Sequence, residues 1–212
     1  MSIDLSRLVS KLFRAKSHLI FEADCSQFPY PNPRDGEQFL VIDDKNIESH
    51  RDICAALLKI DRDAQDYLKD VKRGKVAAFI ILNEGEIVHC SYVFFENKTA
   101  CILGLPGTSA LIGNAFTVPS YRGRGCQPRS VAARASIARA ENFARVVAET
   151  SPDNARSQSG LRKAGMRLAG RMDMFVILNV LVIRWRRPSD YPLFGFCIRA
   201  RRRAAATASA SP

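Results

Sequence analysis

The feature that most restricts the fold of this chain is a nearly continuous apolar run at residues 110–118, followed by a loop rich in glycine and arginine. Such a run predicts a central strand that is buried on both faces. The loop covers residues 119–127, and Pro128 favours the start of a helix because proline loses no hydrogen bond in the first turn. The sequence therefore predicts a strand, a tight loop and a helix at the centre of the fold.

The segments around this unit predict an α/β protein, with a mixed sheet of about six to seven strands and flanking helices. Further strands are expected over residues 18–23, 75–82, 86–95, 99–103 and 145–149, and one or two over 166–187. Further helices are expected over residues 3–13, 47–59, 62–72 and 153–164. We divide the chain into an N-terminal helix (1–16), a main domain (17–187) and a basic, Ala/Ser-rich tail (188–212) that we expect to be disordered.

The chain carries 32 Lys and Arg against 21 Asp and Glu, a net charge of +11. The longest apolar run, at residues 174–183, is too short for a transmembrane helix, which needs about 20 residues. Seven arginines against Asp190 give residues 184–203 a local charge of +6. This tail could contact anionic lipid through Phe194 and Phe196, whereas no motif for specific nucleic-acid binding is present.

The cysteine and histidine content argues against a metal site. The six cysteines form no CxxC pair, and only three histidines are present, so no zinc pattern appears. Cys54 and Cys90 lie in apolar stretches, which favours reduced cysteines in the core. The first residues show no secretory leader pattern, and we therefore expect a reducing, cytoplasmic location.

The loop at residues 119–127 has the composition of an anion-binding loop. Gly123 and Gly125 allow the backbone to curl so that successive amides point to one place, in front of a helix N-terminus. Arg122 and Arg124 could add charge-assisted bonds to phosphate oxygens. The alternative is an ordinary turn with solvated arginines. Because Pro128 replaces a third glycine and no Gly-Lys-Ser/Thr follows, the loop matches neither a dinucleotide fingerprint nor a P-loop.

Two motifs in this sequence resemble those of the GCN5-related N-acetyltransferases (GNATs). The first is the acetyl-CoA loop, here Val118, Pro119, Tyr121, Arg122, Gly123, Arg124 and Gly125. The second follows some 30 residues later, here Asn154, Ser157, Lys163, Gly165 and Met166. The resemblance covers residues 109–178, and is only topological over 17–103.

The resemblance implies acetyl-CoA as the cofactor, bound where two central strands splay apart. The pantetheine arm would contact the main chain of Phe116, Thr117 and Val118, and a backbone N–H near Val118 would polarise the acetyl carbonyl. The implied pyrophosphate ligands are the amides of Gly123, Arg124, Gly125, Cys126 and Gln127. Asn154 and Ser157 would lie on the cofactor side. A free amine of a small molecule or peptide would attack directly.

This chain also departs from the family pattern. Gln127 is bulkier than the usual residue of the loop, and Leu161 and Leu111 stand where some members carry a general acid and a base. The remaining candidates for catalysis are His89, Ser91, Asn114 and Glu149. Each has a structural alternative: a core histidine with its hydrogen bonds satisfied, and a turn capped by Glu149. An ordered water chain could also remove the proton.

Two further hypotheses stay open at this stage. The chain could be a module of the same fold that binds acyl-CoA without catalysis, which the inert Leu161 and Leu111 favour. The loop over residues 22–37 carries Glu22, Asp24, Asp35 and Glu37 and could line a pocket for a cationic amine, or it could be solvated. The oligomeric state and the acceptor are not indicated by the sequence.

Overall fold

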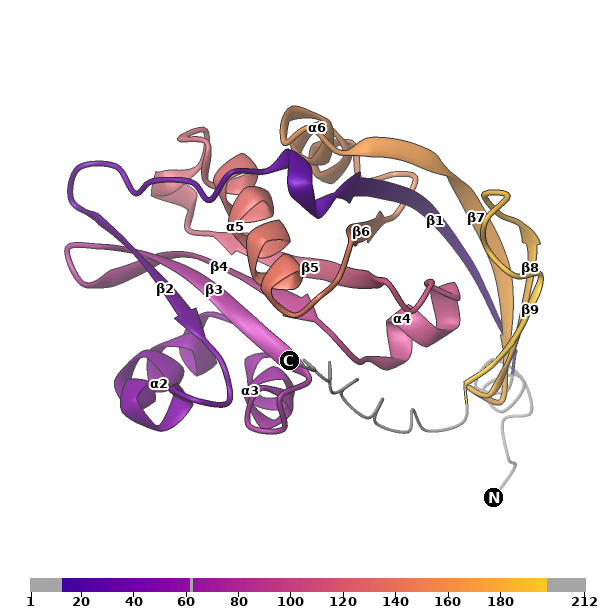
Figure 1. The fold of residues 1–212 in the computed structure, drawn as a ribbon, viewed down its shortest axis with the longest axis horizontal. Coiled ribbons are helices and arrows are strands. Elements are labelled where there is room, and N and C mark those ends of the chain that lie inside the picture. Colours follow the sequence, from indigo (N-terminus) through magenta and orange to yellow (C-terminus); the bar gives the residue numbers. More distant parts are fainter. Residues whose placement is uncertain (1–12, 62, 198–212) are drawn as a thin grey trace, which may run out of the picture.

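The computed structural model describes residues 13–61 and 63–197, which form one mixed nine-stranded sheet with helices on both faces (Figure 1). The order of the strands in the sheet is β2-β3-β4-β5-β6-β1-β7-β8-β9. All neighbouring strands are antiparallel except β5 and β6, which are parallel. The strands are β1 (Phe13–Asp24), β2 (Glu37–Ile42), β3 (Val76–Asn83), β4 (Glu86–Phe94), β5 (Ser109–Thr117), β6 (Arg145–Thr150), β7 (Arg167–Ile177), β8 (Leu181–Arg186) and β9 (Phe194–Phe196).

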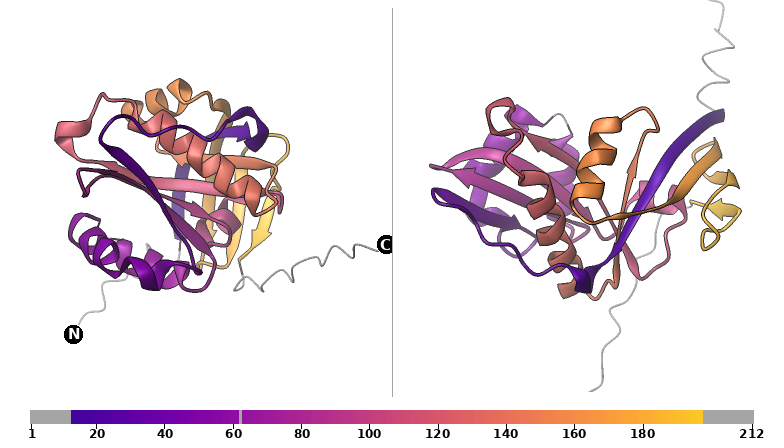
Figure 2. Two further views of the ribbon diagram at one scale, coloured as in Figure 1. Left: turned by 60° about the vertical axis from the view of Figure 1, so that its left-hand side comes forward. Right: turned by 90° about the horizontal axis from the view of Figure 1, so that it is seen from above.

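Helices cover both faces of the sheet. The α-helices are α2 (Arg51–Ile60), α3 (Ala64–Val71), α4 (Lys98–Leu103), α5 (Cys126–Ala140) and α6 (Ala155–Lys163), and short 3-10 turns are η1 (Cys25–Gln27), η2 (Ile47–His50) and η3 (Pro119–Tyr121). In Figure 2, α2 and α5 lie on opposite sides of the strands. One cluster of buried apolar residues joins α2, α3 and α4 to the sheet, and a second joins α5 and α6 to the other face.

The face of α5 that packs on the sheet is the one predicted from helical spacing. Val131, Ala135 and Ala138 lie at positions i, i+4 and i+7 and are fully buried in the second cluster. Pro128 lies in the first turn, as expected, although the helix begins two residues earlier at Cys126. The central unit of strand, loop and helix is thus confirmed.

The expected strand over residues 99–103 is wrong, because these residues form α4. The Asn97 side chain caps this helix by accepting a hydrogen bond from the Ala100 amide at 2.6 Å, and Gly104 ends it in a left-handed conformation. These two local signals outweigh the apolar, β-favouring content of the segment. The sheet nonetheless has nine strands rather than six to seven, because β2 and β9 were not expected and residues 166–187 form two strands.

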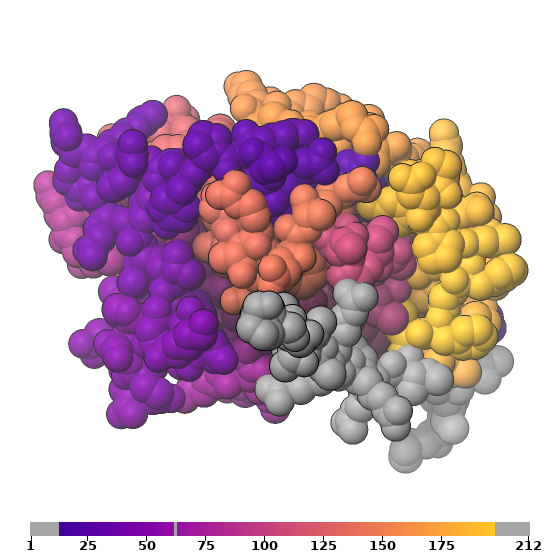
Figure 3. Space-filling model, in the orientation of Figure 1, coloured from indigo at the N-terminus to yellow at the C-terminus, as the bar shows by residue number. Residues whose placement is uncertain are grey.

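The boundaries at both ends of the main domain also differ from those expected. β1 begins at Phe13, so residues 13–16 are strand rather than helix; the rest of the predicted helix lies outside the described residues. Residues 188–197 are ordered rather than a tail: Tyr191 is buried and β9 pairs with β8. The remainder of the predicted tail, residues 198–212, is not among the described residues. Residues of β8 and β9 form the right-hand side of the molecule in Figure 3.

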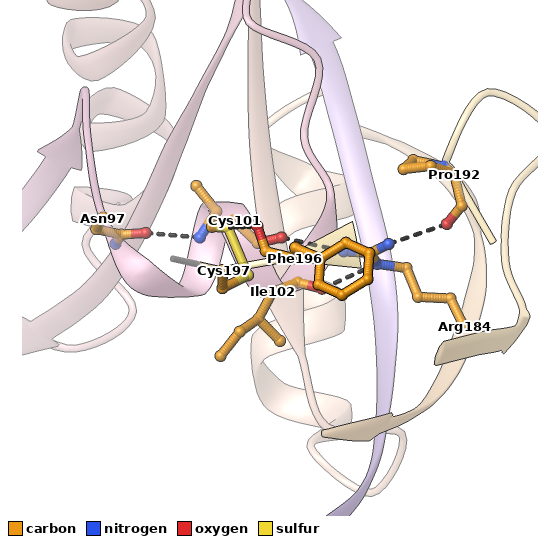
Figure 4. Close-up of a disulfide and its surroundings, with 8 residues drawn as sticks. Asn97, Cys101, Ile102, Arg184, Pro192, Phe196 and Cys197 are labelled. Carbon is orange, nitrogen blue, oxygen red and sulfur yellow. Dashed lines mark hydrogen bonds between the residues drawn. A yellow bond between two sulfur atoms is a disulfide. The ribbon is translucent and has the colours of Figure 1, made fainter. Parts of the chain in front are cut away.

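A disulfide fixes the segment that carries β9. Cys197 is bonded to Cys101 of α4, and the buried Arg184 donates hydrogen bonds to the carbonyls of Cys101, Ile102 and Pro192 (Figure 4). Cys54 and Cys90 are free thiols, as expected. Disulfides are typical of oxidising compartments, so this one does not favour the expected reducing location.

Candidate functional site

The two central parallel strands diverge after a short contact. β5 and β6 pair at three positions only, from Ser109 opposite Arg145 to Leu111 opposite Val147. Beyond them β5 continues to Thr117, pairing only with β4, and β6 continues to Thr150, pairing only with β1. The edges of β5 and β6 that face each other therefore carry unpaired backbone groups. This is the predicted splay.

A bulge in β5 lies at the opening. The register between β4 and β5 shifts between Cys90 and Tyr92, so that two residues of β5, Asn114 and Ala115, stand opposite one of β4. Asn114 has φ of +46°, a left-handed conformation that asparagine tolerates better than most residues. Its side-chain amide donates to the hydroxyl of Tyr67 on α3. The bulge lies where β5 no longer pairs with β6, and bulges bend the strand that carries them.

The loop after β5 carries consecutive backbone amides that have no backbone acceptor among the described residues. Gly123 and Gly125 adopt φ of +80° and +70°. Among the backbone hydrogen bonds of turns, loops and helix caps in the described residues, none is donated by the amides of residues 123–127. α5 starts directly behind, and Gly125 at its N-cap offers no side-chain acceptor to the first-turn amides. This arrangement suits an anion, which would supply the missing acceptors.

The splay and the loop open into one cleft of about 810 Å³, a size typical of small-molecule sites. Its walls come from β5, the loop, the start of α5, the end of β6 and α6. Of the residues predicted from sequence, it brings together Asn114, Phe116, Thr117, Arg122, Gly123, Gly125, Cys126, Gln127, Glu149, Asn154 and Ser157. His89, Val118 and Arg124 are not among the lining residues.

The charge of the cleft lining is positive. Arg122, Arg156 and Lys163 line it, against the single carboxylate of Glu149. Arg122 is held by a bond from Nε to the Thr117 carbonyl at 3.2 Å. Sequence reasoning did not single out Arg156, whose position on the first turn of α6 becomes informative only when α6 is known to face the loop.

Two other arginines lie near the loop. Arg124 stacks over the Tyr121 ring, with 4.4 Å between the guanidinium carbon and the ring centroid. A Cβ built on Gly125 would lie 3.5 Å from Nη2 of Arg34, so this guanidinium reaches the loop. Arg34 comes from the acidic loop considered for the acceptor. That loop contributes no lining residue; Glu37, for example, pairs with Arg129.

The contact between α5 and α6 explains how Gln127 is accommodated. A Cβ on Gly160 would lie 3.3 Å from Cγ of Gln127, so this side chain runs against α6 at the position where α6 has no side chain. At the start of α6, Asn154 accepts the Ser157 amide at 3.0 Å as a helix cap. Gln127 therefore packs against a helix at the wall of the cleft.

Glu149 does not cap a turn. Its carboxylate contacts Nδ1 of His18, which lies on β1 beside the end of β6. The side chains are 29% and 18% exposed, respectively, so both are partly shielded but reachable. Sequence reasoning missed His18, because the two residues are 131 positions apart and nothing in the sequence indicates their pairing.

His89 is buried beneath α5 and fully inaccessible. Nδ1 contacts Thr117 Oγ1 at 2.8 Å, while Nε2 has no partner among the described residues. Burial, reinforced by the charges of Arg134 and Arg129, lowers the pKa of His89 to about 3, so it is neutral near pH 7. The structure thus gives His89 a supporting position behind Thr117, outside the cleft.

The other predicted groups divide between core and backbone roles. Ser91 is buried and bonded to Ser130 Oγ at 2.7 Å, away from the cleft. Leu111 and Leu161 are buried in the two apolar clusters. The Val118 amide already donates to the Val88 carbonyl at 3.0 Å, which counts against its expected contact with an acetyl carbonyl.

The solved structures that are similar in fold include GNAT acetyltransferases. A GCN5-related N-acetyltransferase from Sphaerobacter thermophilus is similar at a TM-score of 0.52 and 15% identity, over 81% of this chain and 54% of that one. A GNAT-family acetyltransferase from Colwellia psychrerythraea gives 0.52 and 14%, over 82% and 61%. A putative GNAT acetyltransferase from Novosphingobium aromaticivorans gives 0.50 and 16%, over 76% and 63%.

This chain thus has the GNAT fold, as its two motifs predicted, and it spans little more than half the length of these proteins. No protein-family profile matches the sequence, and no curated protein matches it. At a sequence identity of 14–16%, the similarity to these structures shows the fold alone. Within the described ranges, no helix has the length and apolarity to cross a bilayer, and no cluster of three or more potential ligands could hold a metal ion.

Proposed function

We propose that this protein is an acetyl-CoA-dependent N-acetyltransferase that modifies a primary amine of a small molecule or peptide. The observation that carries the proposal is the cleft itself: unpaired strand edges, a curl of unpaired amides and a positive lining converge on one space. Coenzyme A has amide groups along its pantetheine arm and phosphates at its far end, which match these two surfaces.

The residues proposed to hold the cofactor are those of the cleft. The main chain of Phe116 and Thr117 would pair with the pantetheine arm, and the amides of Gly123 to Gln127 would bind the pyrophosphate. Arg122, Arg156 and Lys163 would neutralise phosphate charge, with Asn154 and Ser157 on the same wall. Bound acetyl-CoA supplies a thioester, in which the acetyl carbon is activated toward an amine.

We assign the proton transfer to Glu149, the one carboxylate that lines the cleft. Its carboxylate would accept a proton from the incoming ammonium, freeing the nitrogen lone pair that forms the new N–C bond as the C–S bond breaks. The thiolate that leaves takes up a proton from solvent or from the amine. His18 holds Glu149 at the end of β6, and Asn114 is held at the facing strand by Tyr67.

A second candidate function is acyl-CoA binding without catalysis. It is favoured by the burial of Leu161 and Leu111, which leaves two positions used for proton transfer in some GNATs without a titratable group. Both functions require the cofactor cleft, and they differ only in turnover. The cytoplasmic location stays a prediction from the sequence, and the Cys101–Cys197 disulfide counts against it.

The test compares two glycines that are matched in conformation. Gly123 and Gly85 have φ of +80° and +83°, and a Cβ on either would meet no atom within 4 Å, but only Gly123 lies in the cleft. At a hundredfold excess over Kd, acetyl-CoA should raise the Tm of the wild type by about 5–10 °C. We expect Gly123→Glu to abolish this shift and Gly85→Glu to retain it.

Release of free CoA with a panel of amines then separates the two functions. Release with at least one amine supports the transferase, whereas a thermal shift without release supports the binding module. A Gly123→Glu variant that keeps the full shift would overturn the assignment of the cleft.

A further inference from the structure

The face of the sheet over β7, β8 and β9 that points away from the core is apolar, and no other described helix or strand covers it. Its members form an aromatic patch, defined as Phe13, Phe175, Leu178, Val180, Trp185, Phe194 and Phe196. Phe196 and Phe194 are 70% and 57% exposed. Trp185 is 49% exposed and packs against Phe175, with ring centroids 4.3 Å apart and the ring planes tilted by 35°. Isolated exposed apolar residues are ordinary, but a contiguous group on one sheet face indicates a partner.

The register of the strands places these side chains together. Phe194 lies opposite Ile183 and Phe196 opposite Leu181, and Phe13 at the start of β1 lies opposite Ile177 of β7. Alternate residues of β7, such as Met174, point to the other face and are buried in the core cluster beneath α2, α3 and α4. The patch therefore lies on the opposite face of these strands, and none of its residues belongs to the apolar cluster under α5 and α6.

The surroundings of the patch are basic. Arg171, Arg186 and Arg187 are exposed on the same strands or directly after them. Between residues 167 and 187 the only acidic residue is Asp173, and it is paired with Arg171 at 2.9 Å. A large apolar surface with a basic margin is the pattern of a protein that lies on an anionic membrane.

The sequence on either side of the patch continues this pattern. Residues 198–203 follow β9 directly and contain four arginines and no acidic residue. Residues 1–12 precede Phe13 and contain Ile3, Leu5, Leu8, Val9 and Leu12 together with Arg7 and Lys11. In the sequence, both segments adjoin the described residues of the patch, and both are rich in basic residues or in apolar residues.

From these observations we infer that the aromatic patch docks onto an anionic lipid surface, with aromatic side chains at the acyl boundary and arginines at the headgroups. A second copy of this chain is the competing occupant. It would bring two basic margins together at the same interface, and like charges there oppose association. Anionic headgroups instead complement the charge. The inference does not depend on the proposed function, because the cleft and the patch share no residue.

The single tryptophan of the chain provides a direct probe, because Trp185 lies in the patch. The full-length protein is mixed with vesicles of phosphatidylcholine alone or of phosphatidylcholine with phosphatidylserine. We expect a blue shift of Trp185 emission and co-sedimentation only with the anionic vesicles, both weakened by salt. No shift, or equal binding to both kinds of vesicle, would overturn the inference.

A double substitution, Phe194→Ser with Phe196→Ser, tests the patch itself. Both side chains are mostly exposed, so the fold should persist, as checked by circular dichroism, while vesicle binding weakens about tenfold for each phenylalanine removed. The matched control is Leu58→Ser, an exposed leucine (51%) on α2, which should bind like the wild type. Undiminished binding of the double variant would contradict a role of the patch. A blue shift that depends on protein concentration without vesicles would instead identify self-association.

Discussion

The cleft and the aromatic patch are both places where part of the sheet has no partner. In the cleft the backbone groups have none, and on the patch the side chains have none. In the cleft the backbone is unpaired, because β5 and β6 separate after Leu111 and Val147. On the patch the backbone is paired across β7, β8 and β9, and no other described helix or strand packs on the apolar side chains. Unpaired amides and carbonyls are directional and select a ligand with matching polar groups, whereas an apolar face binds without direction.

This difference predicts that the two regions respond to different perturbations. The cleft should be sensitive to changes of one charge or one backbone angle, because its geometry has to match one ligand. The patch should lose binding in proportion to the apolar area removed. Three further predictions follow this comparison, beginning with the largest effect.

The largest effect is expected at the carboxylate of the cleft. Glu149→Gln keeps the size of the side chain but removes the proton acceptor, so acetyl transfer should fall by about 10²–10⁴-fold. The acetyl-CoA thermal shift should remain, because no phosphate contact changes. Glu141→Gln, at the exposed end of α5, is the matched control and should be fully active. Equal activity of the two variants would remove Glu149 from the mechanism.

The second prediction concerns the disulfide that attaches β9, and with it part of the patch, to α4. Cys101 and Cys197 close a loop of 96 residues. Their joint replacement by serine should lower the free energy of unfolding by about 2–4 kcal/mol, measured by urea denaturation. Vesicle binding should weaken with it, while the acetyl-CoA shift at a temperature where the protein is folded should not. As a control, a reductant should destabilise the wild type and leave the double variant unchanged; loss of the acetyl-CoA shift would contradict the separation of the two regions.

The smallest of the three effects is a pH dependence of the free energy of unfolding, caused by the buried His89. Burial lowers the pKa of His89 from 6.5 to about 3, so the native state keeps it neutral while the unfolded state takes up a proton below pH 6.5. Its contribution to stability is therefore complete above pH 6.5 and is lost as the pH falls toward 3. The free energy of unfolding should drop by about 2 kcal/mol between pH 7 and pH 5 for this group.

The contribution of His89 is isolated by comparing the wild type with His89→Gln in urea denaturation at each pH. The variant should show a flatter dependence on pH. Parallel curves for the two proteins would show that the histidine is not held neutral in the native state.

The sequence was most informative where structure is local. The apolar run of β5, the two glycines of the loop and the spacing of Val131, Ala135 and Ala138 each depend on residues a few positions apart, and all were located correctly. The prediction missed α4 although its signal is also local. It followed the apolar content of the segment and gave the capping residue Asn97 too little weight.

In the candidate site too, the residues that belong to local motifs were predicted better than those whose position depends on packing. The lining residues in the loop and on α6 follow from motifs, and eleven of the fifteen site residues named from the sequence lie in the cleft. The other four lie outside it because of packing. Ser91 is bonded to Ser130 in the core. His89 faces a helix, the Val118 amide is used by Val88, and Arg124 turns onto Tyr121.

The sequence alone determined the fold class and the glycine turns of the loop after β5, because hydrophobic period, glycine conformation and helix capping act over a few residues. Only the tertiary structure decided that β1 enters the sheet between β6 and β7, which brings His18 to Glu149, and that β9 is tied to α4 by a disulfide. Pairing between distant segments depends on which edges remain open once the local elements have formed, and no short stretch of sequence records that choice.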